Sequence, residues 1–139
     1  MPIFVSAAPS AGIKPSSFFY FLDIATERVS LFFTFNSEKK ARKALQYAEE
    51  RISEIQAITQ DNRPEIIATT IGNYQDEISL ATAEAKKVDD KTKTKNLLIS
   101  IAEESTKHQE RLSEAYNNAS EESKEELKRA IEISIKWQE

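Results

Sequence analysis

Glycine and proline are scarce in this chain, with two glycines and four prolines among 139 residues. β-Sandwiches, barrels and alternating βα folds need turn residues at short intervals, so this scarcity disfavours all three. Cysteine is absent and histidine occurs once, which removes disulfides, thiolate metal sites and most histidine-based catalysis. A hydrophobic content of 40% fits a folded domain, and a net charge of −4 gives no general case for nucleic-acid binding.

Apolar residues recur at steps of three and four along most of the chain, which is the spacing of one helix face. Asn36 and Ser120 precede two of these stretches as caps, and Pro64 stands in the first turn of a third. The pattern predicts helices over about 16–35, 37–59, 64–88, 93–116 and 121–137. Short connections make neighbouring helices antiparallel. We therefore predict an all-α fold, an antiparallel bundle of about five helices.

The first predicted helix is unusually aromatic, because six of the seven phenylalanines lie between residues 16 and 35. Its main stripe consists of Phe18, Phe21, Leu22, Ala25, Val29 and Phe32. Asp23, Glu27 and Arg28 interrupt the stretch, and each would cost about 2.5–3.5 kcal/mol in mid-bilayer, so a transmembrane span is not expected. We instead expect this helix at the centre of the bundle, where several neighbours contact it.

Residues 12–139 are predicted to form a single helical-bundle domain, and residues 1–11 a flexible N-terminus. Val5-Ser6-Ala7 has compact residues at the spacing of a signal-peptidase site and follows a short apolar run. Two interpretations stay open: the end of a secretory leader, or an ordinary chain terminus of small residues.

Two charged residues next to apolar stripes are predicted to pair. Glu27 lies on the aromatic helix, and Arg51 adjoins the stripe of the second helix. We expect a partly buried, charge-assisted bond between them that fixes the register of the two helices. A catalytic role for Glu27 lacks a companion acid or nucleophile at an interpretable spacing.

The single histidine, His108, falls in the apolar stripe of the fourth helix, with Glu104 one turn earlier. A carboxylate–imidazole pair is therefore geometrically available. A metal site would need further ligands from other helices, and no such set is evident in the sequence. We expect a hydrogen-bonded core or boundary histidine, with no metal and no cofactor.

Some phenylalanines of the first helix fall outside its main stripe. Phe19, Phe33 and Phe35 are candidates for a surface that faces a protein partner or a second copy of the chain. The basic runs at 39–43 and 91–95 are interpreted as solvated helix faces.

The stretch 12–23, followed by Glu27, resembles the opening of an uncharacterised helical domain family of bacterial and archaeal exported or cell-surface proteins. That family shows a G-x-x-P-x-S-P-x-Y-x-L-x-x-x-x-E pattern, from which this chain departs by carrying Phe18 in place of the second proline. The similarity extends through 32–40, 48–54, 107–112, 120–124 and 131–134. The resemblance implies a helical bundle in an extracytoplasmic setting and no particular activity.

These observations predict a non-enzymatic, exported helical-bundle module that acts through surface contacts at the cell envelope. The alternative is a small extracytoplasmic binding or chaperone-like protein that holds apolar ligands or segments against the aromatic helix. A cytoplasmic adaptor is a third class. An enzyme is not expected, because no nucleophile–base, metal or phosphate-cradling motif is present.

Overall fold

The computed structural model describes residues 18–59 and 63–138, and of residues 18–21 it describes only the backbone. The helices are α1 (Phe18–Phe32), α2 (Ser37–Ile58), α3 (Pro64–Ala85), α4 (Lys91–Asn117) and α5 (Glu121–Lys136). They pack against one another, and the described ranges contain no strand, so the predicted all-α class and the five helices are confirmed. The N-terminus predicted over residues 1–11 lies outside the described residues.

Local capping sets several of the helix boundaries. The Asn36 side chain accepts a hydrogen bond from the Lys39 amide at 2.9 Å at the start of α2. Asp90 caps α4 in the same way, accepting from the amides of Thr92 and Lys93. Each bond satisfies a backbone donor that the first helical turn leaves without a partner.

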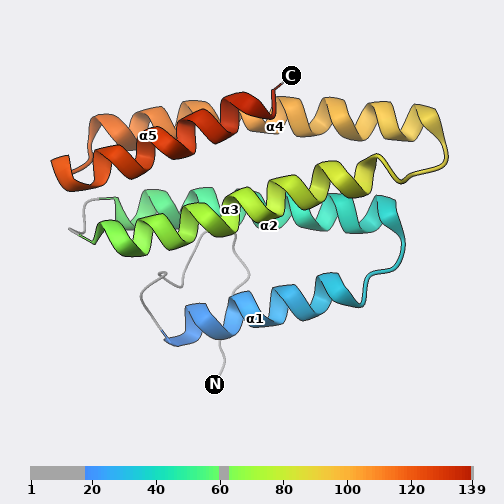
Figure 1. Cartoon of the computed structure of the whole chain (residues 1–139), viewed down its shortest axis with the longest axis horizontal. Coiled ribbons are helices and arrows are strands. Elements are labelled where there is room, and N and C mark those ends of the chain that lie inside the picture. Colours follow the sequence, from blue (N-terminus) through green and yellow to red (C-terminus); the bar gives the residue numbers. More distant parts are fainter. Residues whose placement is uncertain (1–17, 60–62, 139) are drawn as a thin grey trace.

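Helices α2 to α5 enclose the hydrophobic core. α2 and α3 form one antiparallel pair, α4 and α5 form a second, and the two pairs lie face to face (Figure 1). The sequence stripes of α2–α5 supply the buried residues. Among the side chains without measurable exposure are Ile52, Ile55, Ile67, Ile71, Tyr74, Ile78, Leu112 and Leu127.

Helix α1 lies at the edge of the bundle, and the prediction that it occupies the centre is wrong. It packs on the side of the α2–α3 pair that faces away from α4 and α5 (Figure 1). The described part of the stripe expected to be buried points outward: Val29 is 56% exposed and Phe32 is 69% exposed, and Leu22 is exposed too. The two buried side chains on described positions of α1 are Glu27 and Leu31.

Polar contacts explain why α1 turns its polar face toward α2 and α3. The Lys43 ammonium of α2 donates to Ser30 Oγ at 2.9 Å and to Thr34 Oγ1 at 3.4 Å. Arg28 of α1 donates to Asn73 Oδ1 of α3 at 2.8 Å. Since each contact needs the polar face of α1 against α2 and α3, the apolar face is left toward solvent.

An outward apolar face on α1 does not make it a membrane span. The helix has 15 residues, whereas a bilayer crossing takes about 20. None of the described helices is long and hydrophobic enough for such a crossing.

We expect α1 to open before the rest of the bundle, because Leu31 is the one buried apolar side chain among the positions 22–32 whose side chains are described. Native-state hydrogen exchange followed by mass spectrometry should show at least about tenfold less protection for the amides of 22–32 than for those of 41–55. Equal protection in both segments would contradict this peripheral attachment.

Candidate functional site

The side chain of Arg51 is the centre of the candidate site. It projects from α2 toward α1 and α3 and is 0% exposed. Its Nη1 donates to Glu27 Oε1 at 2.8 Å and its Nη2 donates to Glu27 Oε2 at 3.1 Å. The structure thus brings the predicted pair together in a two-pronged bond, the geometry that best matches a guanidinium to a carboxylate.

Four more carboxyl groups surround the same guanidinium. Glu54 of α2 places Oε1 at 2.7 Å from Nε and accepts from Nη2 at 3.1 Å. Glu77 of α3 accepts from Nη1 at 3.4 Å. Glu50 and Asp23 lie 3.6 and 4.0 Å from Nη2, at the more exposed rim. Three helices therefore contribute acids to one cation, and we call this set the Arg51 cluster.

Sequence reasoning missed Glu54 and Glu77. Glu54 lies three residues after Arg51 in α2, and Glu77 lies three residues after Tyr74 in α3. Each acid therefore shares a helix face with a residue that sequence analysis places at the core. This spacing was the available signal. It was not decisive, because acids at such positions usually lie on a solvated helix surface.

Five carboxyl groups are buried or half-buried around one guanidinium in this cluster, and they bind protons more tightly than usual. Burial raises the pKa of Glu27 to about 7 and those of Glu54 and Glu77 to about 8. It raises the pKa of Asp23 to about 6, with the neighbouring Glu27 adding to the effect. Near neutral pH the cluster therefore holds both protons and charges.

Arg51 stays charged throughout. Burial opposes its charged form, but Glu77, Glu54 and Glu27 outweigh burial and raise the pKa of the guanidinium. A permanent cation that bonds to acids from α1, α2 and α3 holds these three helices together.

The rim of the cluster also resembles a cation site in its donor set. Asp23, Glu27 and Glu50 each offer an oxygen atom, and these atoms lie within 4.8 Å of one another. Arg51 Nη2, however, lies within 4.0 Å of a carboxylate oxygen of all three residues. The guanidinium thus supplies the positive charge that these acids share.

His108 is a buried, hydrogen-bonded core residue. Its Nδ1 lies 3.1 Å from the Tyr74 hydroxyl of α3. Burial, with smaller effects from Arg111 and Lys107, lowers the pKa of His108 to about 4, so the ring is neutral at physiological pH. Glu104, the partner that helix spacing made available, instead forms an ion pair with Lys107 at 3.4 Å.

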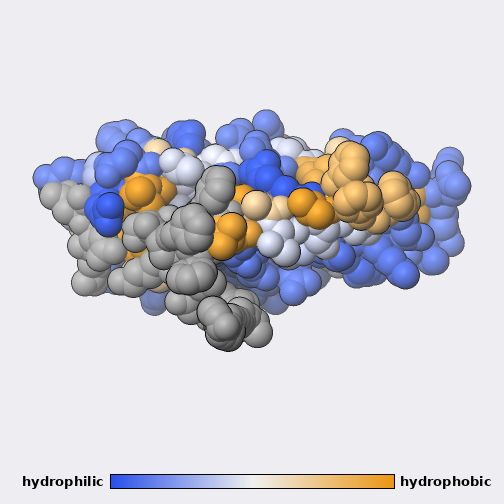
Figure 2. Space-filling view, turned by 90° about the horizontal axis from the view of Figure 1, so that it is seen from below, coloured by the Kyte–Doolittle hydropathy of each residue, from blue (hydrophilic) through white to orange (hydrophobic). Residues whose placement is uncertain are grey.

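The phenylalanines predicted as an interaction surface lie at the turn between α1 and α2. Phe33 is 64% exposed and Phe35 is 85% exposed, and Phe32 beside them is exposed as well. The side chain of Phe19 lies outside the part of the chain that the structure describes. Seen from the α1 side, hydrophobic residues gather along the surface of this helix and its turn (Figure 2).

The chain belongs to the family described as a domain of unknown function (DUF5667), whose model matches residues 12–132. The match confirms membership of an uncharacterised domain family and carries no activity with it. No match was found among curated proteins, and none among solved structures.

Replacement of Arg51 by Met is expected to lower the free energy of unfolding by about 3–5 kcal/mol, because it leaves buried acids without their shared cation. The loss should be smaller at acid pH, where these acids are protonated. Chemical denaturation measures the change. Arg42→Met is the control, since its exposed ion pair with Glu38 contributes at most about 1 kcal/mol. Equal losses in the two variants would contradict a central role for Arg51.

Stability is expected to fall as the pH rises from about 5 to about 8. Glu27, Glu54 and Glu77 have folded-state pKa values above the ordinary 4.5, so over this range they bind more protons in the folded chain than in the unfolded chain. They outnumber His108, whose lowered pKa acts in the opposite direction below about pH 6.5. Their contribution is complete below the unfolded pKa and is lost as the pH passes the folded pKa.

Urea denaturation at a series of pH values, followed by the fluorescence of the single tryptophan, Trp137, measures this slope. The Glu77→Gln variant removes one titrating acid and should show a shallower slope. A wild-type stability that rises over the same range would show that the cluster is not protonated in this way.

Proposed function

We propose that this domain is a non-enzymatic, exported interaction module that binds its partner through the outer face of α1 and the turn that follows. The observation that carries the proposal is the exposure of Phe32 at the end of α1 and of Phe33 and Phe35 in the turn that follows, next to a helix held in place by its polar face. A contiguous apolar patch of this kind on a folded domain marks a contact surface. The Arg51 cluster has a supporting role, since it fixes which face of α1 points outward.

The extracytoplasmic setting is part of the proposal. It rests on the Val5-Ser6-Ala7 pattern and on the resemblance to exported and cell-surface proteins. A cytoplasmic adaptor with the same surface remains the alternative, and protease accessibility of the full-length protein in intact cells distinguishes the two.

The second candidate, a protein that holds apolar ligands against the aromatic helix, needs a hydrophobic pocket there. A groove of about 570 Å³ does lie beside Phe33 and Phe35. Its other lining residues are polar or charged: Thr34, Asn36, Lys39, Arg42, Lys43 and Gln46. This lining favours a surface contact over an enclosed apolar ligand.

Site-specific photo-crosslinking in the native cell tests the proposal. A photoreactive phenylalanine analogue at position 35 should form covalent adducts, whereas the same analogue at the exposed position 135 on α5 should form few. Because Phe35 is 85% exposed, the substitution should leave the melting temperature unchanged. Equal labelling from both positions would contradict a specific contact surface at the α1–α2 turn.

A further inference from the structure

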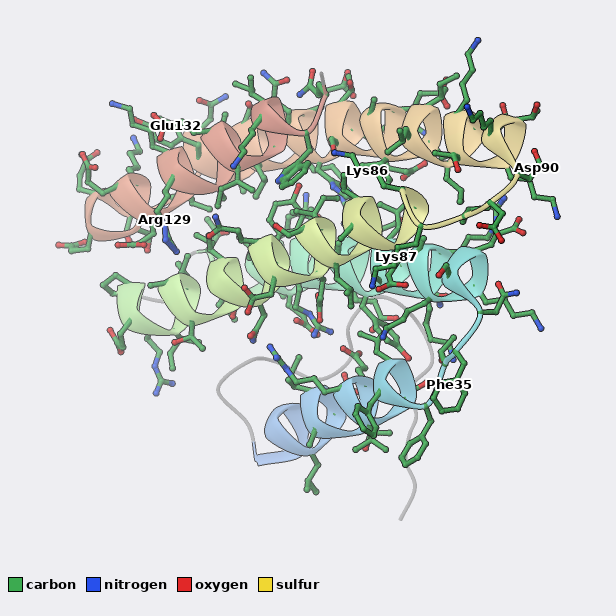
Figure 3. The ribbon with its side chains drawn as sticks, turned by 45° about the vertical axis from the view of Figure 1, so that its right-hand side comes forward. Phe35, Lys86, Lys87, Asp90, Arg129 and Glu132 are labelled. Atoms are coloured by element: carbon green, nitrogen blue, oxygen red, sulfur yellow. The ribbon has the colours of Figure 1, made fainter. Side chains whose placement is uncertain are left out.

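Basic side chains gather at the end of the bundle that carries the exposed phenylalanines. The α1–α2 turn and the α3–α4 turn meet there, as the positions of Phe35, Lys86, Lys87 and Asp90 show (Figure 3). An ion pair of 3.5 Å between Glu38 and Lys93 joins the first turn of α2 to that of α4. We call this end, residues 33–43 and 84–95, the basic end.

The basic end differs sharply in charge from the rest of the chain. It carries nine Lys or Arg side chains against four Asp or Glu, while the whole chain has 19 against 23. The nine are Lys39, Lys40, Arg42, Lys43, Lys86, Lys87, Lys91, Lys93 and Lys95. Some are partly neutralised, since Arg42 and Lys93 pair with Glu38 and Lys87 pairs with Glu84. The net charge of the basic end remains positive, and the remainder of the molecule is strongly acidic.

The apolar and basic groups of this end are interleaved. The groove beside Phe33 and Phe35 is bordered by Lys39, Arg42 and Lys43. A second groove, of about 720 Å³, has Val88, Leu98 and Ile99 among its lining residues. Lysines 86, 87, 91 and 95 surround it. Apolar groups thus lie beside cations on both sides of the basic end.

The kind of cation indicates the partner. Eight of the nine are lysines, which are depleted at protein–protein interfaces, whereas such interfaces enrich arginine. Dispersed lysines next to exposed aromatic side chains suit a surface of anionic lipid headgroups. There the cations bind by charge, and the aromatic rings enter the boundary of the acyl chains.

We propose that the basic end docks onto a bilayer surface that contains anionic lipids. Phe33 and Phe35 insert at the interface, and the surrounding lysines bind the headgroups. The acidic remainder of the chain is repelled by the same surface, so the domain stands with α5 away from the membrane. This inference rests on the proposed contact surface and names its partner.

Co-sedimentation of the full chain with vesicles tests the proposal. We expect binding to vesicles of equimolar phosphatidylglycerol and phosphatidylcholine to be at least about tenfold stronger than binding to phosphatidylcholine alone, because charge attraction contributes much of the affinity. Raising the salt concentration to about 1 M should weaken binding, since it screens exposed charges.

Two variants separate the contribution of the aromatic side chains from that of the lysine charges. Phe33→Ser with Phe35→Ser, and Lys39→Gln with Lys86→Gln and Lys91→Gln, should each weaken binding to the anionic vesicles at least about tenfold. The matched control carries Ile135→Ser, Lys128→Gln and Arg129→Gln on α5 and should bind as wild type. Circular dichroism and melting temperature verify that each variant is folded.

Three results would overturn the membrane assignment: equal binding to both kinds of vesicle, wild-type binding by the double phenylalanine variant, or a dimer in light scattering that this variant abolishes. Photo-adducts to protein from position 35 without vesicle binding would remove the lipid partner and leave the contact surface in place. The absence of adducts and of vesicle binding would remove both.

Discussion

The guanidinium of Arg51 carries a permanent charge, and the fold buries it completely. A charge without water around it is tolerated only when opposite charges and hydrogen bonds replace the solvent. Position 51 on α2 faces the space between α1 and α3, so the acids had to come from those helices as well as from α2. Glu27, Glu54 and Glu77 meet this requirement from three separate helices. The orientation of α1 follows from it.

The helices of this domain are therefore held in two different ways. Helices α2 to α5 are held by the burial of isoleucine, leucine and alanine side chains. Helix α1 adds Leu31 to that core, and its other described contacts with the bundle are largely polar. Apolar burial is insensitive to pH, whereas an acid cluster with raised pKa values is not. The bundle can therefore stay intact under conditions that loosen α1.

Much of this fold could be predicted from the sequence. The stripes of α2–α5, the cap at Asn36, the position of Pro64 at the start of α3 and the contact between Glu27 and Arg51 all follow from spacing and residue chemistry. The position of α1 could not be predicted in the same way. A helical period shows which face is apolar, and assigning that face to the core assumes that apolar burial decides the docking. In α1 the polar face meets Lys43 and Asn73 as well as Arg51, and the first two partners are visible only once the chain is folded.

The Arg51 cluster contacts the inner face of α1, and the exposed phenylalanines lie at the C-terminal end of this helix and in the turn that follows, so the two are linked through α1. If the outer face binds as proposed, a partner that prefers α1 packed against α2 and α3 adds its binding free energy to that of the Arg51 cluster. A change in the cluster that lowers the population of the packed helix lowers the affinity for that partner in proportion to that population. The protonation of Glu27, Glu54 and Glu77 then influences a surface they do not touch. The buried acids would thereby set the range of pH over which α1 is presented.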